Sequence, residues 1–367
     1  MEIKHIDANR HKEWNAFAVQ QPFFALFQSW EWGEVKEKLG WKAFRVSVEE
    51  KGQIIAAAQI FIRSIPLGLP SIAYIPRGPI GNWLDPEVSS QLFSEIHHIA
   101  RSHRAVFLKI EPPVLNDPTV AQLLQQHNFR SCSATLQPRS TIIMDLRPDL
   151  EILFEQIRKT TRRKIKDAAR KGVKIRTGNQ EDLPAFYQLM QITGTRAGFT
   201  IRPFYYYLNE WQTLIEHGRS LMLMALYQDQ LLAVNIIYCF GPHAAFFHQA
   251  SSNEYGNLNP NSLLVWEGIK WLKERDYCTY DLWGISDEIG QIVSQGGDLP
   301  GHERTDGLWG VYQFKSGFSK NVVYYIGAYD FVYRPFLYKI TSSILFSKNL
   351  ERFSIGVEWI RRYLHLS

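Results

Sequence analysis

Two stretches, VSVEEKGQIIAAAQIF (46–61) and LMALYQDQLLAVNIIY (223–238), have the same construction. Each predicts a strand, a tight turn and a second strand rich in aliphatic residues. The second strands begin alike, with QIIA at 53–56 and QLLA at 230–233. Because the segments that follow them also correspond, we interpret the two hairpins as copies of one structural unit.

The elements after each hairpin are expected in one order: an amphipathic helix, a short strand and a closing strand pair. These elements are helices 87–104 and 262–275, strands 105–111 and 277–284, and closing pairs in 132–146 and 321–333. The order predicts an α+β fold with helices on a mixed sheet. It resembles the fold of Gcn5-related N-acetyltransferases and implies two such lobes in tandem.

The length of 367 residues favours two domains and a tail. We expect the first lobe to span 1–147, the second to span 148–330, and 331–367 to form a helical tail that packs back on the first lobe. An alternative for the tail is an amphipathic segment at a membrane surface, because it carries the interfacial residue types Trp359, Arg361, Arg362 and Tyr363.

Composition limits the class of protein. The N-terminus, MEIKHIDANRHKEW, has no apolar stretch behind its charges, and no window reaches about 18 apolar residues, so we expect neither a signal peptide nor a transmembrane span. Cys132, Cys239 and Cys278 lack CxxC and metal-ligand spacing, which favours reduced thiols. We therefore expect a cytoplasmic protein without metal or cofactor, in contact at most with the inner face of the cytoplasmic membrane.

Five motifs are spread over nearly the whole chain. They are FFALFQSWEWGEVKEKLGW (23–41), YIPRGPI (74–80), RRKIKDAARKGVKIR (162–176), EGIKWLKERDYCTYDLWGI (267–285) and GVYQFKSGFSKNVVYYIGAYD (310–330). Together these motifs resemble the Fem-type (FemABX) aminoacyltransferases. The resemblance implies transfer of an amino acid from aminoacyl-tRNA to an amine of a peptidoglycan precursor, either lipid II or UDP-MurNAc-pentapeptide. It further implies a mechanism of substrate alignment and oxyanion stabilisation.

Two features distinguish this chain from related types. Residues 200–220 leave no room for the long helical arm of the staphylococcal-type members, so the chain resembles the armless form. No Q/R-x-x-G-x-G/A loop stands where an acetyltransferase would bind the pyrophosphate of acetyl-CoA. The alternatives are a CoA-dependent N-acyltransferase on the same fold, and a non-catalytic protein that binds RNA or a membrane surface.

The resemblance assigns precursor binding to four residues. Lys36 follows a plausible helix cap at Gln28-Ser29, and a lysine at this motif position contacts the precursor diphosphate in the family. Thr200, Arg202 and Tyr206 match the family's precursor-binding threonine, arginine and tyrosine. Their chemistry is suitable, because a guanidinium binds phosphate oxygens bidentately and an ammonium acts on phosphate as a point charge.

Two candidate catalytic residues are Lys315 and Glu111. Lys315 stands in a run of aromatic residues and glycines, and Phe314-Lys315 matches the family's recurrent FK pair. The match implies that Phe314 binds substrate and that the lysine contacts the tRNA-borne end of the reaction. The alternative is a lysine that reaches solvent from a strand edge. Glu111 ends a predicted strand where relatives often have Asp-Pro, and is a candidate proton acceptor; alternatively, it pairs with Lys109 or Arg77.

A basic helix is expected over 154–171. From Glu155 to Arg176, ten Lys or Arg residues stand against two acidic residues, so we expect an anionic partner rather than a merely solvated face. Either tRNA phosphates or anionic lipid would suit this surface. The residues expected to bind that partner are Arg158, Arg162, Arg163, Lys166 and Arg170.

Overall fold

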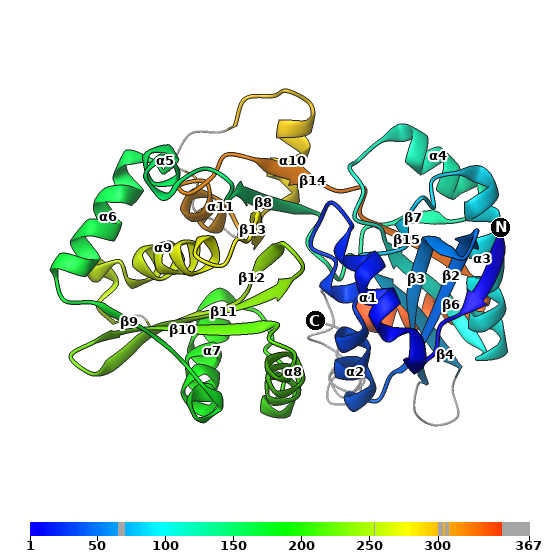
Figure 1. The fold of residues 1–367 in the computed structure, drawn as a ribbon, viewed down its shortest axis with the longest axis horizontal. Coiled ribbons are helices and arrows are strands. Elements are labelled where there is room, and N and C mark those ends of the chain that lie inside the picture. Colours follow the sequence, from blue (N-terminus) through cyan, green and yellow to red (C-terminus); the bar gives the residue numbers. More distant parts are fainter. Residues whose placement is uncertain (65–69, 253, 300–303, 305–307, 347–367) are drawn as a thin grey trace. The chain divides into compact units, whose positions relative to one another are not determined.

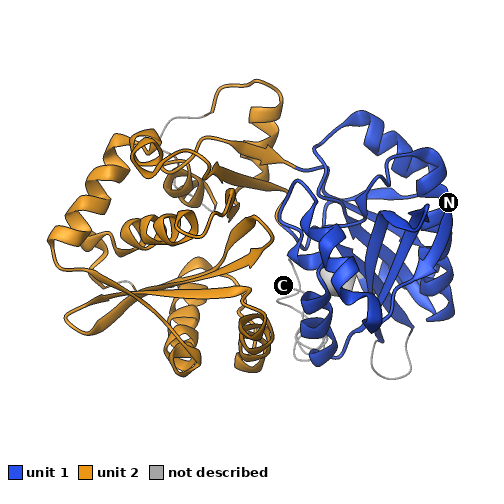
Figure 2. Cartoon of the chain, in the orientation of Figure 1, with its two compact units in different colours: residues 1–137, 325–367 blue, residues 138–324 orange. Residues whose placement is uncertain are grey.

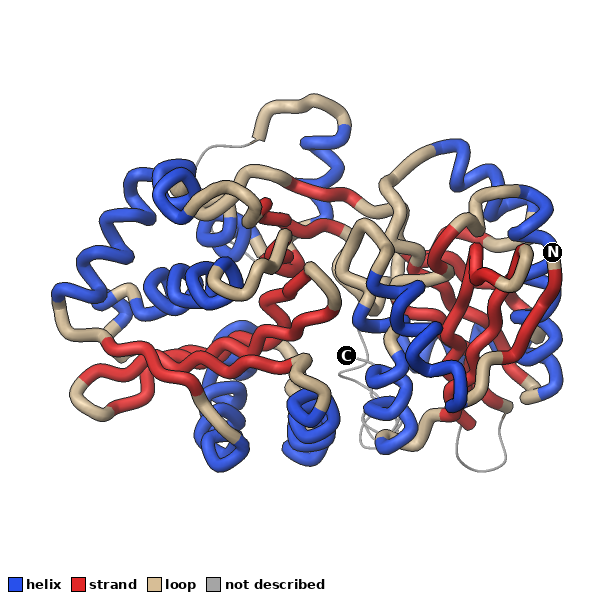
Figure 3. The backbone as a smooth tube through the Cα atoms, in the orientation of Figure 1, coloured by secondary structure: helices blue, strands red, loops and turns tan. Residues whose placement is uncertain are grey.

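The computed structural model of the chain describes residues 1–64, 70–252, 254–299, 304 and 308–346. The chain forms two compact units (Figure 2). Unit 1 combines Met1–Gln137 with the chain from Tyr325 onward, and unit 2 is Pro138–Tyr324. Each unit is built on one β-sheet flanked by helices (Figure 3), which confirms the predicted α+β class.

The sheet of unit 1 has eight strands. They are β1 (Glu2–His5), β2 (Lys42–Glu50), β3 (Gln53–Ser64), β4 (Ser71–Pro76), β5 (Ile80–Gly81), β6 (Ala105–Glu111), β7 (Arg130–Cys132) and β15 (Ala328–Val332). Their order is β1-β2-β3-β4-β6-β15-β7, and β5 pairs with β3 off this path. The β4–β6 pair is parallel, so the sheet is mixed as predicted.

Helices cover both faces of this sheet (Figure 1). They are η1 (Ala8–Arg10), α1 (His11–Val19), η2 (Leu26–Gln28), α2 (Trp30–Lys38), α3 (Pro86–Ser102), α4 (Pro118–Gln126) and α12 (Pro335–Phe346). Side chains alternate along β6: Leu108 and Ile110 join the core with Ile96 of α3, whereas Phe107 meets Tyr338 of α12 at a ring distance of 5.3 Å. The remainder of the predicted tail, 347–367, lies outside the described residues.

The sheet of unit 2 has seven strands. They are β8 (Ser140–Asp145), β9 (Lys174–Thr177), β10 (Ser220–Tyr227), β11 (Gln230–Phe240), β12 (His243–Ser251), β13 (Thr279–Gly284) and β14 (Val322–Tyr324). Their order is β14-β8-β13-β12-β11-β10-β9, and the β12–β13 pair is parallel. This sheet is also mixed, like that of unit 1.

The helices of unit 2 also lie on both faces of its sheet (Figure 1). They are α5 (Leu150–Gln156), α6 (Lys159–Arg170), η3 (Gln180–Asp182), α7 (Leu183–Ala197), α8 (Phe204–Glu216), η4 (Gly256–Leu258), α9 (Pro260–Lys273), α10 (Asp287–Ser294) and α11 (Trp309–Lys315). Buried Ile165 and Ala168 of α6 pack with Leu264 of α9 in the hydrophobic core of unit 2. Strand β10 begins soon after α8 ends, so no long helical arm interrupts the chain there.

The predicted duplication is visible in backbone detail. In the β2–β3 hairpin the register shifts between Val48 and Glu49, and in the β10–β11 hairpin it shifts at the equivalent step, between Ala225 and Leu226. Both turns have two residues with positive φ, Lys51-Gly52 and Gln228-Asp229. Two positive φ values are characteristic of the tight turns whose twist matches antiparallel strands. The two hairpins are therefore equivalent in bulge position as well as in sequence.

The closing strands are exchanged relative to the prediction. Strand β8, expected to complete the first lobe, lies between β13 and β14 in unit 2, and β15, expected to complete the second lobe, lies between β6 and β7 in unit 1. The boundaries consequently fall at 137/138 and 324/325 rather than at 147 and 330. Strand sequences specify a half-buried extended segment, but the partner strand is chosen by tertiary packing.

The predicted helix over 154–171 is broken in two. Ile157 and Arg158 have extended backbone, with ψ of 136° and 135°, between α5 and α6. The apolar spacing continues across the break, with buried Leu153, Ile157, Thr161 and Ile165, which is why the pattern predicted one helix.

Candidate functional site

Lys315 is the last residue of α11, and its side chain is buried (7% exposed). Its Nζ donates a hydrogen bond of 2.7 Å to the carbonyl oxygen of Gly284 and lies 5.9 Å from the ring centre of Phe246. Burial lowers the pKa of the Lys315 ammonium to about 7, although the charge of Asp281 opposes this shift. The group therefore changes charge near neutral pH. The alternative of a lysine on a strand edge is wrong.

The carboxylate of Asp281 is fixed within β13. It accepts hydrogen bonds from the backbone N–H of Trp283 (2.7 Å) and from the hydroxyl of Thr141 on β8. Trp283 has φ of 68°, and the β13–β8 register is interrupted between Asp281 and Gly284. An irregular strand end thus provides both the carbonyl that holds Lys315 and the acidic charge that acts on it.

The start of α6 meets the end of α11. The backbone N–H of Arg158 donates to the Gly317 carbonyl (2.9 Å), and its guanidinium donates to the Ser316 hydroxyl (2.8 Å). A Cβ at Gly317 would lie 2.3 Å from Oγ1 of Thr161, so this approach requires glycine. The structure therefore joins the predicted catalytic lysine to the predicted basic helix, although the two are far apart in the sequence.

The basic side chains of α6 differ in exposure. Thr161, Ile165 and Ala168 are buried toward the core. Arg163, Lys166 and Arg170 are exposed, and Arg158 and Arg162 are half-buried. No acidic residue occupies the first turn, so the positive end of the helix dipole adds to the side-chain charges. This surface, the α6 basic face, consists of Arg158, Arg162, Arg163, Lys166 and Arg170.

Arg202 lies just before α8 in unit 2. Its guanidinium is 4.8 Å from the ring centre of Tyr206, and its backbone N–H donates to the Tyr207 hydroxyl (3.3 Å). Thr200 precedes it in the same loop and is exposed. The three predicted precursor-binding residues of unit 2 are therefore neighbours, with the tyrosine ring lying against the guanidinium.

A buried carboxylate that the sequence analysis did not identify supports this loop. Glu210, fully buried on α8, accepts from the Tyr238 hydroxyl (3.0 Å) and lies 2.8 Å from Nε2 of His248. Burial, followed by the nearby Glu210 charge, raises the pKa of Tyr206. In the sequence, the only indication of this buried carboxylate was a glutamate four residues after Tyr206 on a helix rich in aromatic residues. The partners of Glu210 come from β11 and β12, which are distant in the chain.

Strand β12 links the two clusters of unit 2. Phe246 contacts Lys315, while Phe247 and His248 both contact Tyr238. The β11–β12 register shifts between Ile236 and Ile237, at the level of Phe247. A bulge changes which face successive side chains point to. Phe314 belongs to the same surroundings: it packs at the edge of the core, 5.5 Å from the ring of Phe318.

Lys36 belongs to unit 1 and lies near the end of α2. Ser29 caps this helix by accepting from the N–H of Trp32 (3.1 Å), which confirms the predicted cap. The side chain of Lys36 is buried, with Nζ 5.3 Å from the ring of Trp32 and 5.9 Å from that of Trp41. Such aromatic faces attract a cation that is partly removed from water.

Glu111 ends β6, as predicted, and is buried in unit 1. One oxygen accepts from the backbone N–H groups of Leu136 (2.6 Å) and Gln137 (3.0 Å), and the other from the Tyr74 hydroxyl. Burial raises the pKa of Glu111, although these bonds oppose the shift. The ion pair proposed with Lys109 is instead made by Asp330 (2.8 Å). Glu111 thus holds the last residues of the Met1–Gln137 segment of unit 1. Its role as proton acceptor stays a prediction.

The predicted residues fall into two groups. Lys36 and Glu111 lie in unit 1, and the other predicted residues lie in unit 2.

Among the described residues, no three or more His, Cys, Asp or Glu side chains are arranged to hold a metal ion. Within the same part of the chain, no helix has the length and apolar character needed to cross a membrane.

Comparison with known proteins now identifies the family. The model of the FemAB family matches residues 10–134, 125–227 and 222–345. The chain belongs to the FemAB family. Its relatives include the lipid II:glycine glycyltransferase of Staphylococcus haemolyticus, 23% identical over 91% of this chain and 94% of that protein. The enzyme of the same name from Staphylococcus aureus (strain MRSA252) is 22% identical over 94% and 96%.

Solved structures support the FemAB fold. The crystal structure of FemX matches with a TM-score of 0.79 and 22% identity, over 93% of this chain and 99% of that one. A tandem GNAT protein from the clavulanic acid biosynthesis pathway matches with a TM-score of 0.53 and 12% identity, over 90% and 98%. The tandem acetyltransferase-like architecture predicted from the duplicated hairpins is thereby confirmed.

Proposed function

We propose that this FemAB-family protein is an aminoacyltransferase that joins an amino acid to the stem peptide of a peptidoglycan precursor. Membership of the family over nearly the whole chain carries the proposal, together with relatives named as lipid II:glycine glycyltransferases. Lipid II is accordingly the first acceptor to test, and UDP-MurNAc-pentapeptide is the second. The donor is an aminoacyl-tRNA.

The α6 basic face supports this choice of donor. Its cations stand beside the Lys315 region through the contacts of Arg158 with Ser316 and Gly317. A tRNA that lies along α6 would place phosphates on the basic face and its aminoacyl end toward α11. Affinity for tRNA should therefore fall steeply with salt concentration. Unchanged affinity between low and high salt would contradict this assignment.

Lys315 is proposed to stabilise charge at the acyl centre. The precursor amine attacks the ester carbon, the tetrahedral intermediate carries an oxyanion, and the bond to the tRNA ribose oxygen then breaks. The amine loses its proton to solvent or to a base, and the ribose oxygen leaves with a proton. A protonated Lys315 in a water-poor site acts strongly on the oxyanion or on a nearby tRNA phosphate.

Arg202 is proposed to bind phosphate oxygens of the precursor, with Thr200 and Tyr206 beside it, and Lys36 of unit 1 is proposed separately as a residue that contacts precursor phosphate. The tyrosine ring under the guanidinium limits its motion, which favours bidentate binding of phosphate oxygens. Replacing Arg202 by alanine should weaken precursor binding by roughly 1–3 kcal/mol, as expected for loss of a charge-assisted contact. Calorimetry with the soluble UDP-linked precursor measures this; equal affinity would refute the role.

The decisive experiment supplies a panel of radiolabelled aminoacyl-tRNAs with lipid II and, separately, with UDP-MurNAc-pentapeptide. The wild-type protein should label one of these acceptors, and Lys315→Met should reduce the rate by about 100-fold or more. Lys320→Met, an exposed lysine five residues further on, serves as the matched control. Absence of transfer from every aminoacyl-tRNA to either acceptor would overturn the proposal.

A further inference from the structure

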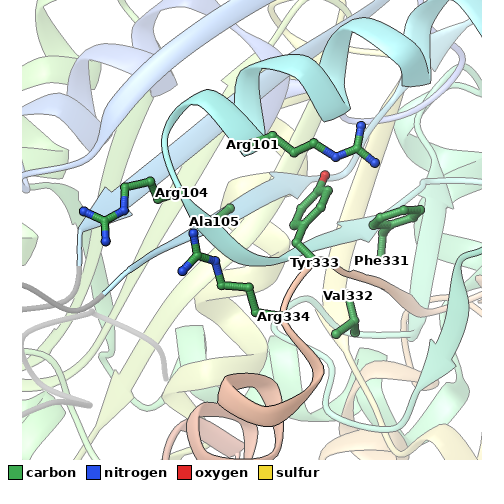
Figure 4. Close-up of a pocket in the computed structure, with 7 residues that line it drawn as sticks. All are labelled: Arg101, Arg104, Ala105, Phe331, Val332, Tyr333 and Arg334. Atoms are coloured by element: carbon green, nitrogen blue, oxygen red, sulfur yellow. The ribbon is translucent and has the colours of Figure 1, made fainter.

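A pocket of about 410 Å³ lies in unit 1 (Figure 4), and neither Lys36 nor Glu111 is among the residues that line it. It is formed where α3 ends, β6 begins, and the chain passes from β15 to α12. Its volume is within the range of small-ligand sites. The lining residues are Arg101, Arg104, Ala105, Phe331, Val332, Tyr333 and Arg334.

Three of these residues are arginines and none is acidic. Arg101 is placed by aromatic rings, with its guanidinium carbon 5.5 Å from the ring centre of Tyr333 and 6.0 Å from that of Phe331. In the described part of the chain, Arg101, Arg104 and Arg334 form no salt bridge with a carboxylate. Clustered guanidiniums without acidic partners favour binding of an anion.

The backbone around the pocket is firmly held. The N–H groups of Tyr333 (2.9 Å) and Arg334 (3.1 Å) both donate to the carbonyl of Val106, which fixes the exit from β15 against β6. Arg334 directly precedes α12, and the first turn of that helix contains no acidic residue. The positive end of the α12 dipole therefore points toward the same site as the arginines.

Exposed apolar side chains follow Arg334 on α12. Phe336 is 76% exposed and Ile340 is 45% exposed; at i and i+4 they share one side of α12. Tyr338 lies on another side of the helix, where it packs on Phe107 and donates to Asp330 (2.7 Å). The helix is thus anchored to the sheet while two large apolar side chains remain in solvent. Apolar side chains next to cations are typical of surfaces that enter the headgroup region of a membrane.

We propose that this pocket binds the phosphate of an anionic phospholipid headgroup, with Phe336 and Ile340 inserted beside it into the membrane interface. A soluble phosphate compound would use the arginines but would leave the two apolar side chains in water, so the combination favours lipid. The inference goes beyond the proposed transfer reaction, because none of its residues has a role in that reaction. The site would hold unit 1 against a membrane surface.

Vesicle flotation tests this proposal, using the full chain and vesicles that contain no lipid II. One set is phosphatidylcholine alone and the other contains phosphatidylglycerol in addition. We expect wild-type protein to float only with the anionic vesicles. The double substitution Arg104→Gln/Arg334→Gln should reduce partitioning roughly 25-fold, because each basic residue at an anionic surface contributes about fivefold. Phe336→Ser/Ile340→Ser should also reduce it.

Controls separate this surface from others. Lys12→Gln/Lys42→Gln removes two exposed cations elsewhere in unit 1 and should change partitioning less than twofold. Arg163→Gln/Lys166→Gln tests the α6 basic face; if this variant alone lost binding, the proposal would be wrong. The proposal also fails if Arg104→Gln/Arg334→Gln floats like wild type. Loss of thermal stability without loss of flotation in Phe336→Ser/Ile340→Ser would assign those side chains to internal packing.

Discussion

At the scale of single residues, the main finding is the environment of Lys315. Its ammonium is removed from water, bound to the Gly284 carbonyl, and influenced by the buried carboxylate of Asp281. The folded-state pKa of about 7 lies below the ordinary 10.5 of lysine. Between these values the unfolded chain binds more protons than the folded one, so this group destabilises the fold at neutral pH, and the effect fades as pH rises toward 10.5.

One prediction follows for stability. Lys315→Met should raise the free energy of unfolding at pH 7 by roughly 1–3 kcal/mol, because an apolar side chain replaces a buried charge. The difference from wild type should shrink as pH approaches 10. Denaturant unfolding at several pH values measures it. A variant that is less stable than wild type at pH 7 would show that Lys315 contributes through packing instead.

A second prediction concerns the pH dependence of transfer. If protonated Lys315 stabilises the oxyanion, activity should decline as pH rises through about 7. Asp281→Asn removes the negative charge that favours the protonated form of Lys315. The fall in transfer activity on the alkaline side of the pH–activity profile (the alkaline limb) should therefore move to lower pH by about one pH unit. Thr141→Val removes the hydroxyl that donates to Asp281 but keeps the carboxylate, and its limb should stay near that of wild type. Identical limbs in Asp281→Asn and wild type would contradict the mechanism.

A third prediction concerns the buried Glu210. Glu210→Gln removes the charge shared with His248 and Tyr238, and should loosen Tyr206 under the Arg202 guanidinium. Precursor affinity should fall by about 1–2 kcal/mol, or 5- to 30-fold in Kd. Glu216→Gln, an exposed glutamate of the same helix, should have no effect. Calorimetry and thermal melting together test this, because a purely structural role would lower the melting temperature and leave Kd unchanged.

At the scale of secondary-structure elements, the junction of α6 and α11 organises unit 2's site. The break at Ile157-Arg158 starts a new helix, and there the backbone N–H of Arg158 donates to Gly317 and its guanidinium to Ser316. An uninterrupted helix would lack this free positive end. The division of the predicted basic helix therefore places the start of α6 against the end of α11.

The close approach at Gly317 provides the fourth prediction. Gly317→Ala should destabilise unit 2 by about 1–3 kcal/mol and reduce transfer, because the added methyl group would overlap Oγ1 of Thr161. In the double variant Gly317→Ala/Thr161→Ala, the colliding hydroxyl is absent and much of the stability should return. Thermal melting of Gly317→Ala, Thr161→Ala and the double variant measures the coupling between the two positions. If the losses of stability in the two single variants simply added up in the double variant, the steric explanation would be contradicted.

At the scale of the whole molecule, the chain crosses between the units twice. Strand β8 completes the sheet of unit 2 although it precedes the rest of that unit, and β15 completes the sheet of unit 1 although it follows unit 2. Cutting the chain at the boundaries expected from the sequence would therefore remove an interior strand from each sheet. Such a strand has hydrogen-bonded neighbours on both sides.

Fragments test this arrangement as a fifth prediction. Residues 138–324 contain every strand of unit 2's sheet and should unfold cooperatively, with dispersed amide resonances. Residues 148–330, of nearly equal length, lack β8 between β13 and β14 and should remain unfolded or aggregate. Cooperative unfolding of the second fragment would show that β8 is dispensable.

Much of the fold was predictable because its signals are local. The hairpins were visible from strand patterns and turns, and the capped α2 was visible from Ser29. Family motifs identified Lys36, Arg202 and Lys315 as candidates. The Glu210 carboxylate was missed, because a single glutamate on an apolar helix does not reveal that Tyr238 and His248 will surround it.

The order of elements, the duplication and the concentration of cations near 158–170 are contained in the amino-acid sequence, since each element, each copy of the hairpin and the cation cluster is a pattern of neighbouring residues. The sheet that receives β8 or β15, the break before α6, and the pairing of Arg158 with Ser316 are not contained in any local pattern. They result from packing between segments more than a hundred residues apart. The chemistry of Lys315 belongs to this second group, because its lowered pKa arises from burial that only the assembled unit produces.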